Sequence, residues 1–297
     1  MIKLATASMN VVYDKQENLR KCLSYIDEAS AQGADLLVLP ELCLQGYLPS
    51  LTQLDMALYQ YQYDNAETVP GGASVQIIIE KAIGRNIYVV FGTTERDAGF
   101  AYKLYNTAVL AGPDGYVGKY RKVHLPLDEN HVFYSGDSFP VYQTKIGRIG
   151  MLICYDKSFP EAAREEALGG ADILVTPLAW PHSAPEYLSD PEKDPNLAKY
   201  RLFDQARAAE NQIFFISSNQ FGPCGNGIYF GYSNIVGPDG AILGTTGPRE
   251  GIVCVEVDLI REIYNGKTLA MEGSNLMRER KPLLYKLLRG ETQQPRP

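Results

Sequence analysis

Three residues with reactive side chains each follow directly after a run of residues typical of a β-strand. Glu41 ends the segment 33–41, Lys122 follows the segment 116–120, and Cys154 ends the apolar segment 148–154. Because ligands of open α/β sheets bind outside the carboxyl ends of the strands, we expect these three side chains to converge at one sheet edge. Taken singly, each has a simpler interpretation: a cysteine in the core, or a carboxylate or lysine at the surface.

Together, the three residue types suit nucleophilic attack on a carbonyl carbon. A cysteine attacks only as its thiolate, and a carboxylate such as Glu41 can accept the thiol proton. An ammonium such as Lys122 favours the thiolate and can hold the oxyanion that forms, with the backbone N–H of Tyr155 as a second donor. One alternative is a papain-like cysteine–histidine pair with His124, but its surroundings do not match a cysteine protease. Another, outside enzymes, is a thiol-based redox sensor.

Composition limits the classes of protein to which the chain can belong. Its 297 residues are 45% hydrophobic and 21% charged, as in soluble globular proteins, and its formal net charge is −7. This charge disfavours binding to nucleic acid or to an anionic membrane. No apolar run has the length of a membrane span or signal peptide, and the five cysteines contain no CxxC pair. We therefore expect a cytoplasmic protein without a zinc site or a disulfide framework.

The order of predicted strands and helices occurs twice along the chain. The strand at 33–40 is echoed 137 positions later, and the strand at 85–92 is echoed 125 positions later. The turn sequence Gly-Pro-Asp-Gly at 112–115 also recurs 125 positions later. Alternating strands and helices predict sheets that are covered by helices. We predict an α/β fold, a four-layer α-β-β-α sandwich built from two similar halves in a single domain at 1–260, with a C-terminal extension at 261–297 that packs on a partner subunit.

Three sequence blocks resemble the signatures of the nitrilase superfamily of carbon–nitrogen hydrolases. They are LPEL at 39–42, YRKVHL at 120–125, and CYD followed by FPE at 154–161, and the resemblance extends from Ile2 to about Asp258. It implies a catalytic triad of Glu41, Lys122 and Cys154, and a further catalytic glutamate at the place of Glu129. It also implies a homodimer or higher homo-oligomer, and a reaction that needs no metal and no organic cofactor.

The reaction expected from this resemblance is hydrolysis of a small-molecule amide to a carboxylic acid and ammonia through a thioester. Tyr155-Asp156 follows the cysteine where true nitrilases usually have Trp-Glu, so the amidase and carbamoylase branches are favoured. The alternatives are an N-carbamoyl amine amidohydrolase, which also releases carbon dioxide, and a nitrilase. Residues near predicted strand ends and in the loops that follow are expected to bind substrate: Tyr47, Trp180, His182, Tyr187, Asn219 and Phe221.

Overall fold

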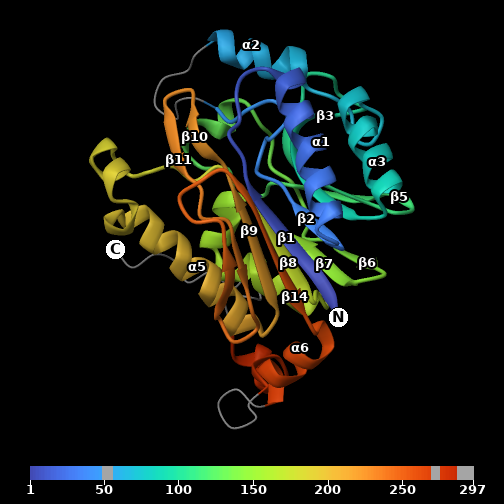
Figure 1. Ribbon diagram of the computed structural model, residues 1–297, viewed down its shortest axis with the longest axis vertical. Helices are drawn as coiled ribbons and strands as arrows, with labels where there is room; N and C mark the ends of the chain where they lie inside the picture. Colours follow the sequence, from blue (N-terminus) through green and yellow to red (C-terminus); the bar gives the residue numbers. More distant parts are fainter. Residues whose placement is uncertain (49–55, 269–274, 286–297) are drawn as a thin grey trace.

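Two six-stranded sheets lie against each other between two layers of helices (Figure 1). The computed structural model of the chain describes residues 1–48, 56–268 and 275–285. Helices α1 and α3 cover one side of the paired sheets and α5 covers the other (Figure 1). The α-β-β-α sandwich predicted from the sequence is therefore confirmed.

The first sheet has the strand order β14-β1-β2-β3-β4-β5. Its central strands β1, β2 and β3 run parallel, and the others pair antiparallel. Along β1 the side chains alternate, so that Ala5 and Ala7 pack under the helices while Leu4 faces the second sheet. The strands are β1 (Ile2–Ser8), β2 (Leu36–Val38), β3 (Tyr88–Arg96), β4 (Leu104–Gly112), β5 (Gly115–Arg121) and β14 (Gly251–Val257), and the covering helices are α1 (Lys15–Ala31) and α3 (Ala73–Arg85).

The second sheet, with the order β13-β12-β9-β8-β7-β6, repeats this plan. Three parallel strands, β7, β8 and β9, are followed by two antiparallel ones, as the sequence repeat predicts. Its elements are β6 (Val141–Thr144), β7 (Gly147–Met151), β8 (Ile173–Leu178), β9 (Phe214–Asn219), β12 (Asn234–Val236), β13 (Ile242–Thr245), α4 (Pro160–Leu168) and α5 (Pro195–Asn211). The main hydrophobic cluster lies between the sheets and extends to α4 and α5.

The remaining elements connect or border these layers. Helix α2 spans Met56–Asn65, the hairpin β10 (Phe221–Cys224) and β11 (Gly227–Phe230) stands apart from both sheets, and 3₁₀ turns are η1 (Leu127–His131), η2 (Cys154–Ser158), η3 (Pro185–Ser189) and η4 (Pro191–Lys193). No helix among the described ranges is long and apolar enough to cross a membrane.

The C-terminal part begins with helix α6 (Leu259–Thr268), whose Ile263 packs into the main core. Helix α6 therefore crosses the predicted domain boundary at residue 260. Beyond it come α7 (Leu276–Glu279) and η6 (Pro282–Leu284), while the rest of the predicted extension, 269–274 and 286–297, lies outside the described residues.

Candidate active site

A buried chain of charged groups connects three of the residues predicted from the sequence. The Lys122 ammonium donates to Oε1 of Glu41 at 2.7 Å and to Oε1 of Glu129 at 2.8 Å. All three side chains have no exposed surface. Glu41 follows β2, Lys122 follows β5 and Glu129 lies in η1. Since β2 and β5 run in the same direction, their ends meet at one sheet edge, as we expected.

Cys154 lies at the start of η2, just after β7, on a sharply bent backbone. Its φ of +47° is in the left-handed region, which non-glycine residues rarely adopt and which is found preferentially at functional sites. The next residue, Tyr155, is in the first turn of η2, where N–H groups have no acceptor within the helix. The chain therefore bends at the residue that carries the thiol.

Asp156 holds this bend and joins it to the segment that carries Lys122. Its carboxylate accepts from the backbone N–H groups of Ile153 at 3.0 Å and His124 at 2.9 Å, and from the Tyr120 hydroxyl at 2.8 Å. The Nδ1–H of His124 also donates to it at 2.8 Å. His124 is thus engaged with Asp156, which argues against the alternative in which it acts as the base for Cys154.

The electrostatic environment couples Cys154 to the charged chain. Burial raises the pKa of the Cys154 thiol well above its usual range, Glu41 raises it further, and Lys122 opposes both. Burial alone would lower the pKa of Lys122, but Glu129 and Glu41 hold it above the usual range. Burial raises the pKa of Glu129 to about 7 against the opposing effect of Lys122. These shifts favour a protonated Cys154 thiol and a positively charged Lys122 in the resting site.

Two further groups fix the Glu41 carboxylate, and sequence reasoning missed both. The Asn106 amide donates to Oε1 at 2.7 Å, and the backbone N–H of Ala179 donates to Oε2 at 2.8 Å. Asn106 lies in β4, inside a run that reads as an ordinary strand. Only its pairing beside the Lys122 segment brings its side chain to the site.

Tyr47, expected to bind substrate, lies at the edge of this cluster. Its hydroxyl donates a short hydrogen bond to Oε1 of Glu129, and Lys122 Nζ is 5.8 Å from the centroid of its ring. Its ring packs edge to face on Tyr229 of β11, with centroids 6.5 Å apart. Tyr229 was not singled out from the sequence. Burial raises the pKa of its hydroxyl, and the nearby Glu41 and Cys154 raise it further, so Tyr229 lies near the same groups.

A cavity of about 360 Å³ opens beside these two tyrosines. Its wall includes Tyr47, Leu48, His182, Leu188, Ile228 and Tyr229. His182, also expected at the substrate site, lines this cavity, but its Nδ1–H is engaged with Asp194 Oδ2 at 2.8 Å. Tyr187 is half-buried in η3 next to Leu188, and Phe221 is half-buried in β10.

Trp180 and Asn219 form a structural pair. The Asn219 side chain accepts from the Trp180 N–H at 2.7 Å and donates to the carbonyl oxygens of Trp180 at 3.1 Å and Gly231 at 3.0 Å. Its amide is therefore engaged within the protein, where it holds the loop after β8. The Trp180 ring packs on Tyr200 and Phe203 of α5.

A second buried ion pair lies in the turn just after Cys154 and was not expected from the sequence. Lys157 of η2 donates to Asp204 of α5 at 2.7 Å, and both side chains are fully buried. Lys157 Nζ lies 3.4 Å from the centroid of the Tyr200 ring and 4.9 Å from that of Trp180. The pair thus connects the cysteine turn to α5 and to the Trp180 loop.

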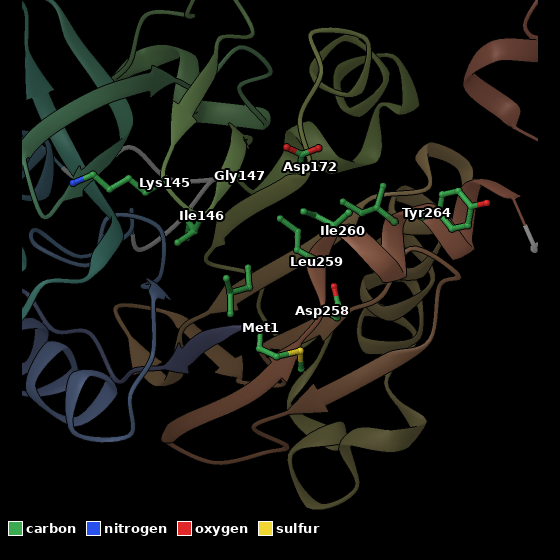
Figure 2. Close-up of a pocket in the computed structure, with 11 residues that line it drawn as sticks. Met1, Lys145, Ile146, Gly147, Asp172, Asp258, Leu259, Ile260 and Tyr264 are labelled. Carbon is green, nitrogen blue, oxygen red and sulfur yellow. The ribbon is translucent and has the colours of Figure 1, made fainter.

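A larger cavity, of about 480 Å³, lies at the opposite end of the strands (Figure 2). It is lined by residues at the start of β1 and β7 and along α6, including Met1, Ile146, Leu259 and Tyr264. Its lysine, Lys145, is paired with Asp114 and in Figure 2 extends away from Asp258 and Tyr264. No cysteine is among the described residues that line this cavity, whereas Tyr47 of the smaller cavity contacts Glu129, so the cluster around Cys154 is the better candidate for catalysis.

Comparisons with known proteins give a family match and several relatives. Residues 3–263 match the carbon–nitrogen hydrolase family. The chain is 33% identical over 264 residues to a nitrilase of Pyrococcus abyssi, covering 87% of this chain and 90% of the relative. It is 33% identical over 269 residues to the human omega-amidase NIT2, covering 86% and 88%.

Solved structures with a similar fold include the Saccharomyces cerevisiae nitrilase-superfamily member Nit3, with a TM-score of 0.77, 26% identity and coverage of 91% of this chain and 94% of that one. Another is a variant of the amidase from Nesterenkonia sp. AN1, with a TM-score of 0.73, 26% identity and coverage of 98% and 97%. That variant carries the acetamide moiety of fluoroacetamide covalently on its active-site cysteine.

Proposed function

The chain belongs to the carbon–nitrogen hydrolase family, and from that premise we propose that it hydrolyses a small-molecule amide to a carboxylic acid and ammonia through a thioester on Cys154. The observation that carries the proposal is the burial of the Cys154 thiol beside a continuous Glu41–Lys122–Glu129 charge chain. A thiol, a base and a fixed cation are the groups that nucleophilic attack on an amide carbonyl requires.

In the first half of the reaction, Glu41 takes the proton of the Cys154 thiol as the sulfur bonds to the carbonyl carbon. Lys122 and the backbone N–H of Tyr155 stabilise the oxyanion. When the tetrahedral intermediate collapses, the C–N bond breaks and Glu41 returns the proton to the departing nitrogen, which leaves as ammonia. The hydrogen bonds from Asn106 and Ala179 keep the Glu41 carboxylate aimed throughout.

In the second half, water attacks the thioester and releases the acid, with Glu41 again as base. Glu129 is suited to position this water or the substrate amide, because its Oε2 is buried and has no hydrogen-bond partner within the described part of the chain. Its Oε1 is meanwhile fixed by Lys122 and Tyr47. The cycle ends with the Cys154 thiol restored.

A substrate panel tests this function and separates it from its alternatives. Primary amides, N-carbamoyl amines and nitriles are each incubated with the protein and with a Cys154→Ala variant, and ammonia and the organic product are measured. We expect ammonia from amides only when Cys154 is present. Ammonia accompanied by carbon dioxide from carbamoyl compounds alone would instead identify a carbamoylase. Oxidation of Cys154 by peroxide without ammonia from any substrate would identify a redox sensor.

We also infer that the protein works as a cytoplasmic homodimer. Exposed apolar side chains occur on the cysteine turn and on the two helices that contact it: Tyr155 in η2, Leu168 in α4 and Leu202 in α5. Pairing of these surfaces between two copies would cover them. Light scattering should give twice the chain mass, and a Leu202→Glu variant should shift the protein to the monomer. A monomeric unmodified protein at micromolar concentration would contradict the dimer.

A further inference from the structure

The cavity beside Tyr47 and Tyr229 lies next to the catalytic cluster. Tyr47 forms part of its wall and also contacts Glu129 through its hydroxyl group. Tyr229 lines the same cavity and packs against Tyr47. An amide whose carbonyl reaches Cys154 would therefore place the rest of its acyl group in this space.

The charged and polar groups on one side of the cavity are already engaged. Asp194, which is fully buried, accepts from the His182 Nδ1–H at 2.8 Å, the Ser183 hydroxyl at 2.6 Å and the Asn196 N–H at 2.9 Å. His182 is thus matched by its own carboxylate. No lysine or arginine is found among the described residues that line the cavity. The rest of the cavity wall is mostly apolar and aromatic, and it includes Leu48, Leu188 and Ile228.

Lys122, the nearest cation of the catalytic cluster, is not available to bind a carboxylate of the substrate. Lys122 is held between Glu41 and Glu129, so its charge is already matched within the cluster. A carboxylate in this cavity would lose water and meet only neutral donors such as the Asn226 amide, with no lysine or arginine among the described lining residues, which is unfavourable. An apolar chain would gain instead, by roughly fourfold in binding for each methylene buried.

We infer that the substrates are uncharged amides with an apolar acyl group, and that the protein discriminates against amides that also carry a carboxylate. This inference rests on the proposed amidase function and narrows its substrate class. It also disfavours N-carbamoyl amino acids, since their carboxylate would meet the same wall.

Matched pairs of substrates test the inference. Butyramide is compared with succinamate and valeramide with glutaramate, with kcat/KM measured by ammonia release. We expect the neutral member of each pair to be favoured by about 100-fold, and kcat/KM to rise from acetamide to valeramide. Equal or better turnover of succinamate or glutaramate would overturn the substrate class but leave the amidase function standing. Absence of ammonia from every amide would reject both.

A substitution in the cavity wall tests directly whether charge there determines the substrate preference. Ile228 lines the cavity on β11, and Ile228→Arg introduces a cation there while Ile228→Gln adds a polar chain without charge. Ile228→Arg should lower the preference for butyramide over succinamate at least about tenfold, mainly through a lower KM for succinamate. If Ile228→Gln changes the preference by as much as Ile228→Arg does, charge at this wall does not select the substrate and the inference fails.

Discussion

Two buried lysines act electrostatically on Cys154, and they differ in the carboxylates that they face. Lys122 lies between Glu41 and Glu129, whose charges hold its pKa above the usual range. Lys157 faces Asp204 at 2.7 Å, and burial lowers its pKa despite this partner. Both side chains are equally inaccessible to solvent, so burial alone does not determine the role of a lysine.

The partners of each lysine explain the difference. Glu41 and Glu129 are both in the cluster around Cys154, so Lys122 stays positively charged next to the reacting atoms. Asp204 also accepts from the Ser217 hydroxyl at 2.7 Å and the Asn234 amide at 3.0 Å, inside the core of the second sheet. We therefore propose a catalytic role for Lys122 and a positioning role for Lys157.

Replacing each lysine by methionine should show the largest difference between their roles. Lys122→Met should lower kcat/KM by about 10³, because it removes an oxyanion donor and leaves Glu41 and Glu129 without their shared cation. Lys157→Met should lower it by less than about tenfold. Circular dichroism and thermal unfolding would verify that both variants are folded. Equal losses in two folded variants would show that the comparison is wrong.

Asp156 connects the segments that carry the two lysines, so its loss should have the next largest effect. Asp156→Asn keeps the shape of the side chain but replaces one of the two acceptor oxygens by a donor, facing N–H groups that then lack a partner. We expect kcat/KM to fall by about 10², because small displacements of a nucleophile are costly. The alkylation rate of Cys154 by iodoacetamide should fall with it. An unchanged rate and activity would mean that the cysteine turn does not depend on Asp156.

Much of the fold could be predicted from the sequence because the repeat is encoded locally. Apolar runs, the helix between them and the Gly-Pro-Asp-Gly turn occur in the same order in both halves, and the structure shows the same strand order in both sheets. The pairing of the edge strands could not be predicted in this way. β14 pairs with β1 over more than 240 positions, and no local pattern indicates such a partner.

The site could be predicted only as far as its residues stand out in sequence. Glu41, Lys122 and Cys154 follow strand ends, and the family resemblance suggested Glu129. Asn106 and Asp204 lie within an ordinary strand and an ordinary helix, and only tertiary packing gives them their partners. The Ala179 N–H is a backbone group, which residue type cannot reveal.

A double-mutant cycle sharpens the positioning role of Lys157. Lys157→Met, Asp204→Asn and the double variant should show a coupling of about 1–2 kcal/mol in urea unfolding, since each single change leaves a buried partner unmatched. Trp180 is the only tryptophan in the chain and its ring is 4.9 Å from Lys157 Nζ. Its fluorescence should therefore change in Lys157→Met. Additive stabilities and an unchanged emission would contradict the assigned role.

The smallest expected effect concerns Glu129 and the pH dependence of stability. Burial raises the pKa of Glu129 from 4.5 to about 7, so the folded state retains a proton that the unfolded state has lost in this range. Its contribution to stability is fully present below pH 4.5 and is lost as the pH rises through 7. As the pH rises from 5.5 to 6.5, the free energy of unfolding of Glu129→Gln should fall by about 1 kcal/mol less than that of the unmodified protein.

Glu166 of α4 provides the control for that measurement. It is fully buried, it accepts from the Met151 N–H at 3.3 Å, and burial raises its pKa to about 9. Glu166→Gln should therefore also weaken the pH dependence of the free energy of unfolding between pH 7.5 and 8.5, where Glu129→Gln has little effect. If both variants respond equally in the alkaline window, the carboxyl of Glu129 does not titrate near neutrality.

The central claim is that Cys154 becomes acylated by an amide within the cluster of Glu41 and Lys122. The most direct test is to mix the protein with a neutral primary amide, quench with acid during turnover, and measure intact mass and the peptide that carries the adduct. We predict an acyl group on Cys154, ammonia released in a burst equal to the enzyme present, and neither in Cys154→Ala. Ammonia release at full rate from Cys154→Ala, or an adduct on another residue, would contradict it.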